Sequence, residues 1–120
     1  MNIIKSLTYQ EKRSTFLALL LKLNSQKEAE DVLKELQLEH KDARHILRAL
    51  RVKNQYGVYI TEASDDKEPI ASMKKVRDLM ERKDIRDVGV YLIRYYGGTK
   101  LGASHLDHVY FTLAMKLLEK

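Results

Sequence analysis

The hydrophobic residues of this chain follow two alternating periods, one typical of β-strands and one typical of α-helices. Short apolar segments, several of which alternate with polar residues, predict strands at residues 6–9, 15–23, 44–52, 56–63 and 87–94. Apolar residues spaced three and four positions apart predict helices at residues 26–38, 69–80 and 103–119. The predicted order of elements is therefore β-β-α-β-β-α-β-α.

Local signals mark the beginnings of two of these helices. Ser25, followed three residues later by Glu28, has the pattern of a capping box. Pro69 suits the first turn of a helix, where its missing N–H is not needed. Hairpins mixed with helices favour an α+β two-layer sandwich, in which the helices cover one face of a sheet of about four strands. The other face of the sheet is then expected to be partly open.

Length and composition narrow the class of protein. The 120 residues, 44% of them hydrophobic, are enough for a single domain, residues 1–120, with one core. Cysteine is absent, which excludes disulfides, thiolate metal ligands and thiol nucleophiles. The longest apolar run, 16–21, is too short for a membrane span or the core of a signal peptide. We therefore expect a cytoplasmic protein that does not bind membranes.

The net charge of +5 is unevenly distributed, and its location is more informative than its total. Residues 41–53 are rich in lysine and arginine, with Asp42 as the one acid, and Arg44 and Arg48 share a strand face with Ile46. If that face is the open side of the sheet, it predicts a surface for RNA or the ribosome, where arginines meet phosphates and tyrosines stack on bases. The alternative is a solvated strand face on which arginine stems cover apolar neighbours.

A second candidate site is the glycine-rich segment between the strand at 87–94 and the last helix. A turn of this kind, placed before a helix, can direct backbone N–H groups toward an anion. The alternative is a tight turn that needs glycine only for its backbone conformation, and the spacing is not that of a P-loop. Together with Arg44 and Arg48, the residues that we predict to bind RNA or another anion are Arg94, Tyr95, Gly97, Gly98, Thr99, Lys100 and Gly102.

Acidic residues gather just upstream of the second helix, at Asp65, Asp66 and Glu68. They would bind a cation only if their carboxylates converged. We favour structural roles, namely capping of the helix or pairing with Arg94 or Lys100. His105 and His108 have a spacing that suits zinc, but no third ligand is evident. We therefore expect neither a metal nor a cofactor.

Three segments together resemble the Impact/YigZ family through its Impact N-terminal domain. They are residues 42–45 (DARH), 64–69 (SDDKEP) and 93–102 (IRYYGGTKLG), and residues 12–16 (KRSTF) resemble the family's opening element. The chain departs from the family pattern at Lys67, where glycine is usual, and at two segments that usually contain glycines, 70–73 and 103–108. The resemblance covers nearly the whole chain.

The resemblance implies a fold similar to the second domain of a ribosomal small-subunit protein and to domain IV of elongation factor G. It also implies a role in translational control, because eukaryotic members of the family compete for the activator of a kinase that senses amino-acid starvation. We therefore interpret the chain as a non-enzymatic, translation-associated protein that binds RNA, the ribosome or a translation-regulatory protein.

Two other interpretations remain open from the sequence. The first is a protein-interaction module that docks a basic partner through the acidic residues 65–68. The second is an enzyme for a small molecule or phosphate ester at the junction of the acidic and glycine-rich segments, which requires a concave pocket holding both Asp66 and Arg94. No nucleophile–base pair stands out in the sequence, so an enzyme is not our prediction.

Overall fold

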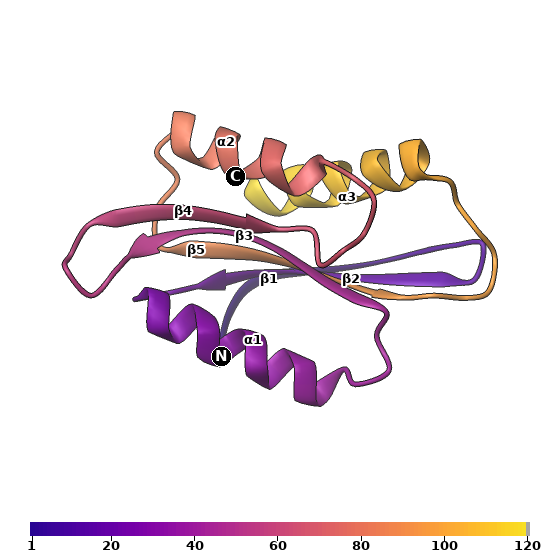
Figure 1. Ribbon diagram of the computed structural model, residues 1–120, viewed down its shortest axis with the longest axis horizontal. Helices are drawn as coiled ribbons and strands as arrows, with labels where there is room; N and C mark the ends of the chain where they lie inside the picture. Colours follow the sequence, from indigo (N-terminus) through magenta and orange to yellow (C-terminus); the bar gives the residue numbers. More distant parts are fainter. Residues whose placement is uncertain (120) are drawn as a thin grey trace.

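A five-stranded sheet forms the centre of the structure, which we describe for residues 1–119 from a computed structural model (Figure 1). The order of elements is the predicted one, and the α+β class is confirmed. The sheet has five strands rather than about four, because the short edge strand predicted at 6–9 is part of a ten-residue strand, Asn2–Glu11, at the N-terminus. The elements are β1 (Asn2–Glu11), β2 (Ser14–Lys22), α1 (Gln26–Glu39), β3 (His45–Lys53), β4 (Tyr59–Ser64), α2 (Ser72–Arg82), β5 (Val88–Tyr95) and α3 (Ala103–Leu118).

The strand order β1-β2-β5-β3-β4 places the last strand of the sequence at the centre of the sheet. All neighbouring strands are antiparallel, and β5 pairs with both β2 and β3. The register sets Thr15 opposite Tyr95 and Arg94 opposite His45. The beginning of β2, the beginning of β3 and the end of β5 therefore lie at the same end of the sheet, although they are far apart in the sequence.

The helices cover both faces of the sheet, which corrects our expectation that they share one face. In Figure 1, α1 lies on one side of the sheet, and α2 and α3 lie on the other. Strand β2 shows why: Phe16 and Ala18 belong to the core beneath α2 and α3, whereas Leu17 and Leu19 pack against the core beneath α1. A continuous apolar run is typical of a strand that is buried on both faces. The face that we expected to be open is therefore largely covered.

The predicted helix beginnings have different outcomes. The cap of α1 is confirmed, because the Ser25 hydroxyl accepts a hydrogen bond of 3.0 Å from the backbone N–H of Glu28. Helix α2 begins at Ser72 rather than at Pro69. The carboxylate of Asp107, in α3, accepts a 2.9 Å hydrogen bond from the Ala71 N–H that precedes α2. Pro69 instead belongs to a loop whose preceding residue, Glu68, is drawn into the protein interior. No helix within residues 1–119 is both long and apolar enough to cross a membrane.

Candidate functional site

The segments that we singled out in the sequence meet at the end of the sheet where β3 begins and β5 ends. The acidic loop, residues 65–69, reaches this end from β4, and the glycine-rich loop, residues 96–102, leads from β5 to α3. Between them lies a cavity of about 370 Å³. The side chains and backbone that line it come from Arg44, His45, Lys67, Glu68, Pro69, Arg94, Tyr96, Lys100, Leu101, Gly102, Ala103 and Leu106.

A buried ion pair forms the base of this site. Glu68 and Arg94 are 7% and 3% exposed, and Nη1 of Arg94 donates hydrogen bonds of 3.0 and 3.2 Å to the two carboxylate oxygens of Glu68. A charge is costly to bury unless it is paired, so each side chain keeps the other in place. This confirms one structural role that we predicted for the acidic segment, pairing with Arg94.

Two further side chains complete the surroundings of Glu68. The buried hydroxyl of Tyr110, in α3, donates a hydrogen bond of 2.6 Å to the Glu68 carboxylate. Burial, and then this bond to an anion, raise the pKa of Tyr110. On the other side, Nε2 of His45 lies 3.5 Å from a carboxylate oxygen of Glu68. The carboxylate thus joins the acidic loop to β3, β5 and α3.

The rest of the acidic loop is anchored in the same way. The Asp66 carboxylate accepts a 2.7 Å hydrogen bond from the backbone N–H of Ile46, and the Asp66 carbonyl oxygen is hydrogen-bonded to His45 Nδ1 at 2.7 Å. The following residue, Lys67, has a left-handed backbone with φ 64°, a conformation that glycine adopts most easily. That geometry explains why glycine is usual at this position in the family that the sequence resembles. Here it leaves a lysine side chain at the rim of the cavity.

Three exposed cations line this cavity together with the exposed Tyr96, and we call Arg44, Lys67, Tyr96 and Lys100 the Tyr96 cluster. The guanidinium of Arg44 lies 4.7 Å from the centre of the Tyr96 ring, and that of Arg94 lies 5.3 Å from it. Within residues 1–119, none of the cluster's three cations forms an ion pair with an acid. Their charge is therefore available to an external anion.

The predicted arginine strip does not form a continuous surface. Arg44 precedes β3 and its side chain lines the cavity. Arg48 lies instead beneath α1, where its guanidinium pairs with Glu30 at 2.6 Å, so the expectation that the two arginines share one strand face is wrong. Only 12% of the Arg48 side chain is exposed. Tyr95 also points toward α1, where its hydroxyl is hydrogen-bonded to His40 at 2.6 Å. Arg48 and Tyr95 are therefore separated from the cavity.

The glycines of the 96–102 loop have separate roles. A Cβ atom on Gly97 would collide with the backbone carbonyl of Arg13, so this glycine permits contact with the β1–β2 turn. Gly98 and Gly102 have left-handed φ angles of 90° and 81°. Gly102 is the N-cap of α3 and lines the cavity. The predicted anion-binding residues that line the cavity are Arg44, Arg94, Lys100 and Gly102, and those that do not are Arg48, Tyr95, Gly97, Gly98 and Thr99.

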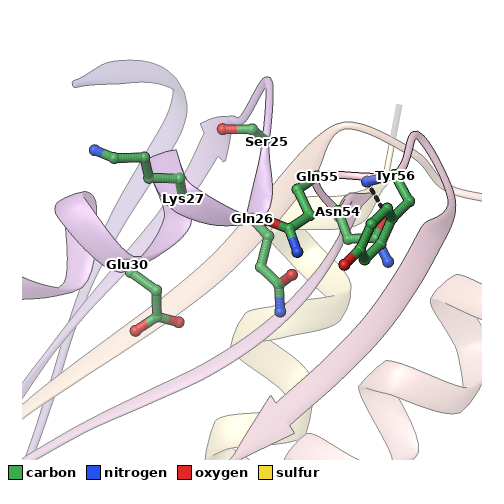
Figure 2. Close-up of a pocket in the computed structure, with 7 residues that line it drawn as sticks. All are labelled: Ser25, Gln26, Lys27, Glu30, Asn54, Gln55 and Tyr56. Atoms are coloured by element: carbon green, nitrogen blue, oxygen red, sulfur yellow. Dashed lines mark hydrogen bonds between the residues drawn. The ribbon is translucent and has the colours of Figure 1, made fainter.

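A larger hollow, of about 460 Å³, lies between the beginning of α1 and the β3–β4 turn (Figure 2). Its polar groups are largely used by neighbouring residues. Gln26 donates a hydrogen bond to Glu62, Glu30 pairs with Arg48, and Asn54 accepts from the backbone N–H of Tyr56. These internal bonds leave little free chemistry for a ligand there.

Metal chemistry has no cluster of side chains to support it in the part of the chain that the structure describes, because no three histidine or acidic side chains converge. His105 is hydrogen-bonded to the carboxylate of Glu11, at the end of β1, rather than paired with His108 as a metal ligand.

Sequence reasoning missed Tyr110, His45 and Tyr96 as members of the site. Tyr110 lies among the apolar residues of the last helix, and its polar partner is 42 positions away in the sequence. No local pattern indicates such a contact.

The fold and the site define a small α+β domain with a buried arginine–glutamate pair beneath a cavity rimmed by cations. The chain belongs to the Impact N-terminal domain family, whose profile matches residues 12–118. Among curated relatives it is 33% identical to Protein IMPACT of Xenopus laevis over 110 residues, which cover 89% of this chain and 35% of that protein. It is 26% identical to IMPACT family member YvyE of Bacillus subtilis (strain 168), over 82% of this chain and 45% of the relative. It spans less than half the length of these relatives.

Solved structures share the fold. A protein described as hypothetical superposes with a TM-score of 0.80 at 23% identity, covering 98% of this chain and 58% of its own. The two-domain translational regulator Yih1 superposes with a TM-score of 0.58, also at 23% identity, covering 98% of this chain and 45% of its own.

Proposed function

We propose that this chain is a translation-associated binding protein that contacts RNA or the ribosome through the Tyr96 cluster. The observation that carries the proposal is the set of three unpaired cations, Arg44, Lys67 and Lys100, that line one cavity together with an exposed aromatic ring. Cations without internal acids can replace the counterions of a polyanion. The family supports the link with translation, since Yih1 is described as a translational regulator.

The alternative of docking through the acidic residues 65–68 has less chemistry available to it. Glu68 is buried against Arg94, and Asp66 accepts a hydrogen bond from the backbone of β3. An enzyme at this junction required a pocket lined by both Asp66 and Arg94, but the cavity is lined by Arg94 and Glu68 without Asp66. The acids stabilise the loop, while the cations face outward.

The direct test is binding of the purified protein to ribosomes and to total RNA at 50 and 200 mM salt. We expect binding that weakens steeply as the salt concentration rises. We also expect the double substitution Arg44→Glu/Lys100→Glu to lower the affinity by about tenfold or more, because two attractive contacts become repulsive.

The matched control is Lys34→Glu/Lys74→Glu, which makes the same change in net charge at exposed positions of α1 and α2. This control should bind nearly as well as the wild type. Equal loss in the two double variants would show a response to net charge alone and would overturn the proposal. Absence of binding by the folded wild-type protein at low salt would also overturn it and would direct the search to a protein partner.

A further inference from the structure

The wall of the site cavity combines three features that proteins use to hold phosphate, and each comes from a different element. They are the N-terminus of α3, the guanidinium of Arg94 in β5, and the cations of the Tyr96 cluster. The cavity volume of about 370 Å³ leaves room for a phosphate group and part of the molecule that carries it.

Helix α3 begins without a side-chain cap. Its N-cap is Gly102, which has no side chain to accept a hydrogen bond, and its first turn contains no acid. The first hydrogen bond of the helix runs from Leu106 N–H to the Gly102 carbonyl at 3.0 Å. The N–H groups of residues 103–105 therefore precede the first helical bond, at the positive end of a 16-residue helix.

Arg94 provides an independent indication of a ligand. It is 97% buried (3% exposed), and both of its hydrogen bonds to Glu68 come from Nη1. Its Nε atom is buried without a hydrogen-bond partner among the described residues. Arg94 also lines the cavity, and only Nη1 of its guanidinium is used by Glu68. Because an unsatisfied buried donor is costly, the donors left over favour an acceptor bound in that cavity.

The charge balance favours an anion with more than one negative charge. Glu68 neutralises Arg94, and its carboxylate also accepts the Tyr110 hydroxyl, so it presents little free charge to the cavity. Arg44, Lys67 and Lys100 then leave an excess of positive charge at the rim. The Tyr96 ring already has two guanidinium groups near it, so the recognition chemistry is that of an anion rather than of a stacked base.

We propose that this cavity is a phosphate-binding site, in which the N-terminus of α3 and Arg94 meet the phosphate oxygens and Arg44 and Lys100 neutralise its charge. The proposal rests on the proposed function, since it specifies which part of an RNA the Tyr96 cluster would recognise. The same chemistry would also accept a free phosphate ester.

The first experiment titrates the protein with inorganic phosphate and monitors its backbone amides by NMR. Chloride keeps the ionic strength constant and serves as the control anion. We expect saturable shifts at residues 103–105. We also expect at least a threefold weakening in Ala103→Pro. Proline is tolerated at the first position of a helix, so this substitution removes one N–H donor without altering the charge or the helix. Arg44→Gln should weaken binding further, and Lys34→Gln should leave it unchanged.

Shifts that do not saturate, or saturable shifts that Ala103→Pro and Arg44→Gln leave unaffected, would overturn the site. The second experiment compares a short RNA with and without a 5′-phosphate, each in competition with inorganic phosphate. Tighter binding of the phosphorylated RNA identifies a terminal phosphate as the ligand, and equal binding with competition identifies the RNA backbone; both support the site. Phosphate binding without RNA binding would retain the site and overturn the proposed function, whereas RNA binding without phosphate binding would do the reverse.

Discussion

Each end of the sheet has a tyrosine surrounded by cationic side chains, but acids balance only one of them. At the end where β3 leads into β4, Arg51, Lys53 and Arg86 lie 5.4, 5.5 and 4.7 Å from the ring centre of Tyr59. Asp84 pairs with both arginines, at 3.0 and 2.8 Å, and Asp87 accepts the Tyr59 hydroxyl. We call these six residues the Tyr59 cluster.

At the opposite end, the acid is beneath the cations rather than among them. Glu68 is buried and pairs with Arg94, while Arg44, Lys67 and Lys100 have no acidic partner in residues 1–119. The two clusters thus have similar residue types but different free charge. The comparison teaches that a net charge of +5 does not locate a binding surface, because the pairing of each cation decides whether it can attract an anion.

The largest expected contrast concerns the acid of each cluster. Glu68→Ala leaves the Arg94 guanidinium buried without a partner, and removing one side of a buried pair costs about 3–5 kcal/mol. Asp84→Asn removes the charge of an exposed acid and keeps a residue that tolerates the left-handed backbone there. Arg86 is half-exposed and the largely buried Arg51 keeps its hydrogen bond to Thr61, so the effect on stability should be smaller. Urea unfolding followed by circular dichroism measures both changes.

A second variant separates the charge from the cavity that Glu68→Ala creates. The double substitution Glu68→Leu/Arg94→Met replaces the pair with apolar side chains, and it should recover much of the lost stability. If the double variant is as unstable as Glu68→Ala, packing rather than the uncompensated charge explains the loss.

The next contrast concerns the two tyrosine hydroxyls that bind acids. Tyr110→Phe removes a buried hydrogen bond to the Glu68 carboxylate and should lower the free energy of unfolding by about 1.5–3 kcal/mol. Tyr59→Phe removes the bond to Asp87 at the surface, where water can replace it. Urea unfolding measures both changes. An equal loss in the free energy of unfolding for the two variants would contradict the view that only the Glu68 end is built on a buried charge.

These contacts show how far the sequence could predict the site. Pairing between the acidic segment and Arg94 was predictable, because both segments were expected at one end of the sheet. The position of Arg48 was not, because alternation along a strand defines its faces without stating where the strand begins or which helix covers each face. The run of apolar residues at 16–21 contained the missing information, since a strand that is apolar on both faces requires cover on both.

The limits of helix prediction have a similar physical cause. Ser25 caps α1 through a residue three positions away, so the signal is contained in the local sequence. The Ala71 N–H that precedes α2 is satisfied by Asp107, which is 36 positions away. Local patterns could not indicate that contact, and they instead favoured Pro69 as the start.

Salt dependence of RNA binding gives a finer contrast between the clusters. Each phosphate contact contributes somewhat less than one unit, about 0.7–0.9, to the slope of log affinity against log salt concentration. Arg44→Gln should therefore reduce the slope by about one such contact, whereas Arg86→Gln should leave it unchanged because Asp84 already occupies that arginine. Fluorescence anisotropy with a labelled RNA at four salt concentrations measures both slopes. A reduced slope in Arg86→Gln would mean that the Tyr59 cluster also binds RNA.

The smallest expected effects are in the pH dependence of stability, where the two ends should respond with opposite signs. Partial burial raises the pKa of Asp65, with a further contribution from the nearby charge of Asp107, and a backbone hydrogen bond from Met73 only partly offsets the rise. At the other end, hydrogen bonds from Arg86 and then Arg51 hold the pKa of Asp84 below its usual value.

The raised pKa of Asp65 means that its ionisation opposes folding, and this cost develops as the pH rises through the folded-state pKa. Asp65→Asn should therefore increase stability at pH 7, and its advantage should vanish below the unfolded-state pKa of about 3.9.

The lowered pKa of Asp84 means that its ionised form stabilises the fold above about pH 3.9, and this benefit is lost as the pH falls through the folded-state pKa. Asp84→Asn, which suits the left-handed backbone there (φ 53°), should decrease stability at pH 7. Thermal unfolding of both variants between pH 3 and pH 7 measures the two trends, and trends of the same sign would mean that the acids at the two ends have equivalent environments.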